Sequence, residues 1–223
     1  MYEAKVLEQF RQMPAFRLAD VAQIIQNRLY AKKFMKKMVT EGKIKKIKRG
    51  FYTLHEDPLL VSTYVVRSSY VSSVSALAFH RMITQIPNKI FCFTEKSSSQ
   101  ITFISDILYF HTDYFFGFRQ EDYESFFVPI ALPEKAVIDS IGVVPVSVFE
   151  EVFEDIDIKA LMVLLEKIKK GSIVKRIGYL AERNGFDVYK HLKKFLNNKY
   201  VLLDPLSKKS GNKNPKWKVI VNG

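Results

Sequence analysis

Apolar residues spaced three and four apart predict three helices near the start of the chain. Val6 and Phe10 place an amphipathic helix in residues 2–12, and Val21 with Ile25 places a second, shorter helix after Pro14. A third helix continues to Thr40. Its expected apolar face consists of Leu29, Ala31, Phe34, Met35 and Met38.

A short basic hairpin follows the third helix. Gly42 suits the C-terminal end of that helix, and residues 44–47 have the composition of a short strand. Lys48-Arg49-Gly50 predicts the turn, because glycine allows a positive φ, and residues 51–54 form the return strand. The alternation is imperfect, since Ile44 and Ile47 would fall on opposite faces of a regular strand.

Three helices followed by a basic hairpin are typical of a winged helix-turn-helix. In such a domain the third helix enters a DNA groove and the hairpin contacts the flanking phosphates. His55-Glu56-Asp57-Pro58 has the composition of a connector. We therefore expect a DNA-binding domain of residues 1–57 and a second domain of residues 58–223.

The rest of the chain mixes strand and helix patterns. Strands are predicted at 70–72, 90–94, 100–105, 107–111, 115–119 and 127–131, and helices at 73–80, 133–139, 159–169, 172–183 and 188–196. Two terminal strands, 200–205 and 216–221, should enclose a polar loop at 207–215. The expected fold class is α+β, with an N-terminal winged helix-turn-helix followed by a mixed α+β C-terminal domain.

Charged residues are distributed less evenly along the chain than apolar residues are. The 223 residues carry a formal net charge of +12. Residues 1–54 hold thirteen basic and four acidic side chains, residues 106–157 are strongly acidic, and the chain is basic again from Lys159. This asymmetry predicts different partners for different segments, with a polyanion for the first.

Candidate DNA-binding residues follow from the predicted helix and hairpin. Side chains at the turn and at the start of the third helix usually supply contacts to base edges, whereas lysines at a hairpin tip reach phosphates. On the third helix, Tyr30, Lys33 and Lys37 share one face, with Lys32 and Lys36 beside it. The candidate residues are Gln26, Asn27, Arg28, Tyr30, Lys32, Lys33, Lys36, Lys37, Lys46, Lys48 and Arg49.

No sequence motif for catalysis, metal or cofactor binding is present. The four histidines are widely separated, the lone Cys92 lies in an apolar run, and no phosphate-cradling glycine loop occurs. Glu134 and Asp139 would lie on different faces of a helix, which argues against a paired-carboxylate site. We therefore expect no enzyme, no catalytic or metal-binding residues and no cofactor.

Nothing in the sequence predicts a membrane protein. The N-terminus lacks the apolar stretch of a signal peptide, and no apolar run approaches the roughly 20 residues that span a bilayer. The single cysteine excludes an intrachain disulfide, which fits a reducing compartment. A cytoplasmic protein without a membrane partner is expected.

Five motifs together resemble the AbiEi family, the DNA-binding antitoxins of type IV toxin–antitoxin and abortive-infection operons. Their order along the chain carries the resemblance more than any one of them. They are the hairpin ending Arg49-Gly50-Phe51-Tyr52, the Tyr70–His80 segment with Gln85–Asn88, the Ala131–Asp139 segment, Arg176–Leu180, and Leu203-Asp204-Pro205 ahead of Asn214–Trp217.

The resemblance implies a winged domain that binds inverted repeats in double-stranded operator DNA and represses its own promoter. It also implies a C-terminal domain that opposes an AbiEii-like toxin resembling nucleotidyltransferases. Two alternatives stay open on the residues alone. One is a solitary winged-helix regulator with another partner for its C-terminal domain, and the other is a metal-dependent nuclease, which would need clustered carboxylates.

Overall fold

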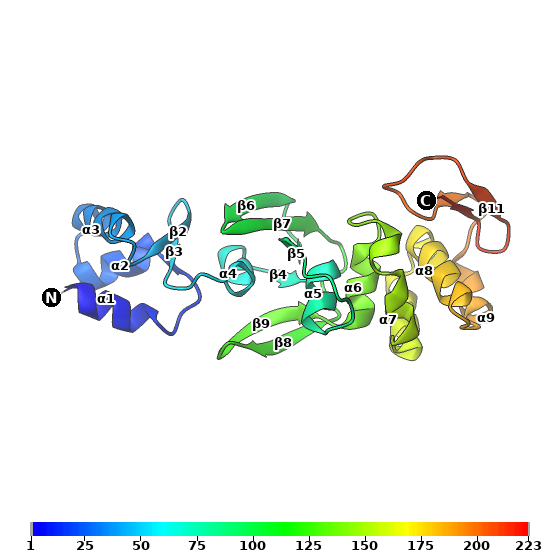
Figure 1. Cartoon of the computed structure of the whole chain (residues 1–223), viewed down its shortest axis with the longest axis horizontal. Helices are drawn as coiled ribbons and strands as arrows, with labels where there is room; N and C mark the ends of the chain where they lie inside the picture. The colour runs from blue at the N-terminus through cyan, green and yellow to red at the C-terminus, as the bar shows by residue number, and fades with distance from the viewer. Residues whose placement is uncertain (1, 223) are drawn as a thin grey trace. The chain divides into compact units, whose positions relative to one another are not determined.

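The computed structural model describes residues 2–222 as a mixed α+β fold (Figure 1). The chain divides into two compact units. Unit 1 comprises residues 1–71, 88–112 and 120–129, and unit 2 comprises residues 72–87, 113–119 and 130–223. The α+β class predicted from the sequence is therefore confirmed.

Unit 1 begins with three helices around a small core of their own. They are α1 (Tyr2–Phe10), α2 (Leu18–Ile25) and α3 (Arg28–Thr40). The core is built from one face of each helix together with a residue of the first strand and one just before the hairpin: Val6, Phe10, Phe16, Val21, Ile25, Ala31, Met35, Met38 and Ile44. The rings of Phe10 and Phe16 stack at 4.2 Å between centroids, which closes this core on the side of α1.

The phase of α3 corrects one prediction. Leu29 was expected on the apolar core face, but 78% of its surface is exposed. The buried positions are Ala31, Met35 and Met38, which follow each other at four and three residues. Two residues turn a helix by about 200°, so Leu29 must point away from the side that Ala31 faces. Leu29 is an exposed apolar side chain at the N-terminal end of α3.

A three-stranded sheet with the order β1-β3-β2 packs beside the helices. Its strands are β1 (Phe16–Arg17), β2 (Lys45–Lys48) and β3 (Phe51–Thr53). Lys46 pairs with Tyr52 and Lys48 pairs with Phe51, so Ile47 is an extra residue at a β-bulge. The bulge resolves the imperfect alternation, because it allows both Ile44 and Ile47 to be buried.

A six-stranded sheet forms most of the remainder of unit 1, and α4 (Pro58–Val65) belongs to the same unit. The strand order is β6-β7-β5-β4-β9-β8, with β5 parallel to β7 and antiparallel to β4. The bounds are β4 Ser69–Val71, β5 Lys89–Thr94, β6 Ser99–Phe103, β7 Ser105–His111, β8 Phe118–Tyr123 and β9 Phe126–Ala131. The strand expected at 115–119 is wrong for its first three residues, which precede β8.

Within unit 2, α5 (Ser73–Phe79) packs against α6 (Pro133–Ser140) through a buried polar cluster. The Lys135 ammonium group donates a hydrogen bond to Asp139, and the Ser72 hydroxyl donates another to the same carboxylate at 2.7 Å. Both charged side chains are almost completely buried. The Glu134 carboxylate accepts from the backbone of Asp157 at 3.3 Å. Glu134 and Asp139 thus make structural contacts.

The C-terminal part of unit 2 is helical and ends in a small sheet. The helices are α7 (Ile158–Ile168), α8 (Gly171–Arg183) and α9 (Tyr189–Leu192), with 3₁₀ helices at Val146–Val148, Glu150–Glu154 and Lys193–Phe195. The sheet has the order β10-β12-β11, from Val201–Leu202, Val219–Val221 and Asn212–Asn214. The loop expected at 207–215 was therefore wrong at β11, and both predicted terminal strands are shorter than expected.

The terminal sheet is held to α8 by Trp217. Its ring lies against Gly178, where an added Cβ would be 2.1 Å from the ring, so only glycine fits there. The indole N–H donates to Glu182 at 2.7 Å. Nearby, the Arg176 guanidinium donates to the Leu202 carbonyl at 2.7 Å, and Asp204 accepts from the Leu206 backbone at 2.8 Å. Arg176, Gly178, Asp204 and Trp217 thus make structural contacts within unit 2.

The domain boundary predicted at residue 57 stays a prediction. By compactness, residues 1–71 belong to the same unit as the central strands, although the three N-terminal helices keep a separate core. Asp57 caps α4 and accepts a hydrogen bond from the hydroxyl of Tyr123 at 2.5 Å. From residue 2 to residue 222, no helix combines the length and apolar character needed to cross a membrane.

Candidate nucleic-acid interface

The N-terminus of α3 is fixed by a local cap. Asn27 precedes the helix in an extended conformation, and its side-chain oxygen accepts from the backbone N–H of Tyr30 at 2.9 Å. Gln26 has a left-handed conformation (φ 57°) at the end of α2, which turns the chain from α2 into α3. The Gln26-Asn27 pair therefore builds the turn between the two helices.

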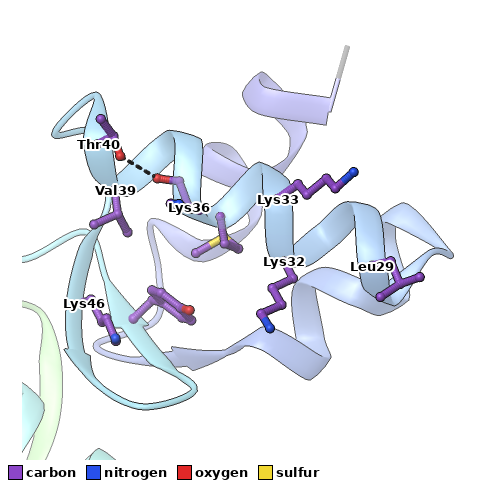
Figure 2. A pocket seen from close by; sticks show the side chains of 9 residues that line it. Leu29, Lys32, Lys33, Lys36, Val39, Thr40 and Lys46 are labelled. Carbon is purple, nitrogen blue, oxygen red and sulfur yellow. Dashed lines mark hydrogen bonds between the residues drawn. The ribbon is translucent and has the colours of Figure 1, made fainter.

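A groove of about 650 Å³ runs between α3 and the hairpin (Figure 2). Met35, Val39 and Tyr52 give it an apolar lining, and all of its charged side chains are lysines. Lys32 extends from α3 toward the hairpin, and Lys46 projects from β2. The complete lining is Leu29, Lys32, Lys33, Met35, Lys36, Val39, Thr40, Lys46 and Tyr52.

A second hollow, of about 770 Å³, continues from this groove along the N-terminal end of α3. Lys32 and Lys46 line both, and the second also contains Arg28, Arg49 and Arg17. Arg17 was not among the predicted residues. It lies at the short β1 strand, which has no recognisable sequence pattern, so only pairing with β3 reveals its position. Arginine and lysine side chains from α3, β1 and the hairpin therefore share one surface.

The cations around the groove differ from their neighbours in being unpaired. Across residues 2–222, the side chains of Lys32, Lys33, Lys36 and Lys46 make no ion pair or hydrogen bond. By contrast, three nearby lysines have carboxylate partners: Lys37 with Glu41 at 3.6 Å, Lys43 with Glu3 and Glu41, and Lys45 with Glu56 at 2.9 Å. A concave surface with unpaired cations suits a polyanion, which would neutralise them.

Five predicted residues line neither hollow: Gln26, Asn27, Tyr30, Lys37 and Lys48. The Tyr30 ring lies 6.1 Å from that of Tyr2, in a separate hollow that also contains Glu3. Lys48 donates to the carbonyl of Val65 at 3.3 Å and lies over the Phe51 ring. Burial lowers the pKa of Lys48, and the charges of Lys96 and Arg17 lower it further. Lys48 is thus in a different environment from Lys46.

Leu29 is the residue of the groove that sequence reasoning placed wrongly. It stands beside the unpaired lysines at the N-terminal end of α3. The signal that identifies it is its spacing from Ala31, Met35 and Met38, which puts it outside the buried stripe. Among the described residues, no group of three or more histidine, cysteine, aspartate or glutamate side chains is arranged to hold a metal ion.

Comparisons with known proteins establish the fold alone. No protein-family model matches the chain, and no curated protein matches it. The crystal structure of the Rv2827c protein from Mycobacterium tuberculosis is similar, with a TM-score of 0.66 at 12% sequence identity. The match covers 98% of this chain and 90% of that one. The whole α+β arrangement therefore has a counterpart among solved structures.

Proposed function

We propose that the N-terminal helices and hairpin are a winged helix-turn-helix that binds double-stranded operator DNA. The observation that carries this proposal is the set of unpaired lysines around the groove between α3 and β2. Helix α3 is the recognition helix, and the hairpin is the wing. Lysines and arginines from both elements contact phosphates, while the exposed N-terminal end of α3 reaches base edges.

The pairing pattern supports a specific orientation of the DNA. Lys46 and Lys45 are neighbours in one strand, but Lys45 is paired with Glu56 whereas Lys46 opens to the groove. A lysine that already has a carboxylate partner releases fewer counterions when DNA binds, because part of its charge is already neutralised. The duplex therefore lies on the side of the hairpin that carries Lys46.

The experiment compares these two lysines in the full-length protein. Fluorescence anisotropy with the DNA upstream of the gene measures affinity as a function of salt. Lys46→Ala should weaken binding to all duplexes and reduce the slope of log K against log salt by about one. The matched control, Lys45→Ala, should change the slope much less. Equal effects of the two variants would reject the orientation, and no binding by the intact protein would reject the function.

We further propose that the protein is an AbiEi-type antitoxin that acts in the cytoplasm by binding and has no reaction of its own. The motifs that resemble this family support the proposal, as does the compactness of unit 2. In this role the protein represses its own promoter at inverted repeats and counteracts a nucleotidyltransferase-like toxin.

Co-expression tests the antitoxin role. The product of the neighbouring gene is expressed in a host whose growth it arrests, and the intact chain is then supplied. Growth should recover. Failure of the intact chain to restore growth, with DNA binding retained, would favour a solitary regulator. Cleavage of duplex DNA only when Mg²⁺ is present would instead favour the metal-dependent nuclease.

A further inference from the structure

A cluster of cations lies in unit 1 apart from the groove. Residues of β1, of the hairpin, of the end of α4 and the chain after it, and of the β5–β6 turn line an open cavity of about 450 Å³. Four cationic side chains line it, Arg17, Lys48, Arg67 and Lys96, and no carboxylate does. Apart from Arg17, none of them lines either hollow along α3.

The four charges are not neutralised within the chain. Within residues 2–222, none of these side chains forms an ion pair with an acidic residue. Lys48 donates one hydrogen bond to the Val65 carbonyl, and Arg17 lies over the Phe51 ring at 5.0 Å from its centroid. Partial burial lowers the pKa of Lys48, and so do the positive charges of Lys96 and Arg17. The cavity therefore keeps like charges close together, and a bound anion would relieve their repulsion.

The remaining lining is suited to a phosphate group. Ser97 and Ser99 lie in the same cavity and carry hydroxyl groups that can donate hydrogen bonds. Arginine matches phosphate geometry with paired N–H groups, and lysine supplies a compact charge. The face of Phe51 adds an apolar wall. A cavity of this volume is within the range of roughly 300–1,000 Å³ that is typical of small-molecule sites.

We propose that this cavity binds the phosphate groups of a small phosphorylated molecule of nucleotide size. The proposal does not depend on DNA binding by the groove. A phosphate of the DNA backbone is the other source of the same chemistry. The cavity favours the small molecule, because its lysines are not those of the groove and, apart from Arg17, none of its cations lines either hollow along α3.

The test uses the full-length protein and isothermal titration with pyrophosphate and with ATP, without added metal and at constant ionic strength. We expect saturable one-to-one binding. Lys96→Ala and Arg67→Ala should each weaken it by about fivefold or more, since each removes a charged hydrogen-bond donor. Lys32→Ala is the matched control, because it removes an equal charge from the groove, and it should leave this binding within about twofold.

The same variants are then titrated with duplex DNA. Lys32→Ala should weaken DNA binding, and Lys96→Ala should not. Loss of DNA affinity in Lys96→Ala, without saturable binding of pyrophosphate or ATP, would overturn the proposal and make the cavity a contact for the DNA backbone. Equal weakening of pyrophosphate binding by Lys32→Ala and Lys96→Ala would overturn it as well, because the anion would then respond only to total charge. The pyrophosphate titration contains no DNA, so failure of the proposed DNA-binding function leaves it unaffected.

Discussion

The N-terminal and C-terminal regions are both basic, yet they use their cations differently. Residues 158–223 contain sixteen basic and four acidic side chains, a larger excess than in residues 1–54. Several of these cations are engaged within unit 2. Lys175 is buried and donates to Asn197 at 2.7 Å, Lys194 pairs with Glu166 at 2.9 Å, and Lys167 lies over the ring of Phe116. Among the residues that the structure describes, Lys32, Lys33, Lys36 and Lys46 around the α3 groove have no such partners.

The difference shows that net charge is a poor guide to an interface. A cation that is fully buried, or that already forms an ion pair with a carboxylate, gains less from a further anion, since it is out of reach or its charge is partly neutralised. Availability distinguishes the lysines of the groove from the engaged cations of unit 2 named above. Substitutions of the engaged side chains of unit 2 should therefore alter stability, and substitutions around the groove should alter binding.

The largest effect is expected for the buried pair in unit 2. Asp139→Asn leaves the buried Lys135 ammonium group without its carboxylate, which should lower the free energy of unfolding by about 3–5 kcal/mol. DNA affinity of the folded variant should not change. Urea denaturation and anisotropy measure the two quantities. The double variant Lys135→Met with Asp139→Leu should be more stable than Asp139→Asn alone. If Asp139→Asn leaves the free energy of unfolding unchanged, the Lys135–Asp139 pair does not stabilise unit 2.

A smaller loss of stability is expected where Trp217 packs on α8. Gly178→Ala would favour an exposed helix by about 1 kcal/mol, but here the new methyl group collides with the indole ring. The free energy of unfolding should fall by about 1–3 kcal/mol. In a Trp217→Leu background the same substitution should cost much less, because the ring is gone. Additive losses in the double variant would show that the two residues do not interact.

A smaller effect is expected on duplex affinity, where one lysine from each region can be compared. Lys36 is unpaired in the groove, whereas Lys194 is paired with Glu166. Lys36→Ala should weaken duplex binding by about fivefold to tenfold at low salt, and Lys194→Ala by less than about twofold. Anisotropy on the intact protein measures both. A stronger effect of Lys194→Ala would mean that the basic C-terminal region contributes to DNA binding, and the contrast between the regions would fail.

The smallest expected effect concerns Leu29. An exposed leucine among groove lysines can contact the C5-methyl group of thymine, which deoxyuridine lacks. Replacing the contacted thymine by deoxyuridine should weaken binding about threefold to fourfold, the effect of one buried methyl group. Leu29→Ala should bind the two duplexes about equally. If the wild-type protein tolerates deoxyuridine at every thymine of its operator, Leu29 makes no such contact.

Local sequence patterns predicted where the helices and strands lie, but they did not predict which strands pair with one another. Gly42 and Gly50 marked the end of α3 and the hairpin turn, because both require a positive φ that other residues avoid. Leu29 was assigned to the core face because it is apolar, although its spacing from Ala31, Met35 and Met38 puts it outside the buried stripe of α3. The bulge at Ile47, strand β11 and the parallel pairing of β5 with β7 depend on partners elsewhere in the chain. No local pattern contains that information.

The same limit applies to the candidate site. The sequence predicted basic residues on the third helix and the hairpin, and the structure gathers Arg28, Lys32, Lys33, Lys36, Lys46 and Arg49 around two adjoining hollows. The pairing of Lys37 with Glu41 has the i,i+4 spacing of a helical ion pair, so the sequence contains it. The sequence could not reveal that Lys48 lies in another cavity, because that outcome depends on residues at the end of α4 and in the β5–β6 turn, which are distant along the chain.

The interleaving of the two units determines when each part of the protein can be completed during synthesis. The chain passes between the units five times, and unit 1 needs residues up to 129. The core around α1–α3 requires nothing beyond the hairpin, whereas Trp217 reaches α8 only when almost the entire chain has left the ribosome. Because domains form from the N-terminus as the chain emerges, α3 and its groove are in place first. A nascent or truncated product therefore carries the groove before it has a complete unit 2.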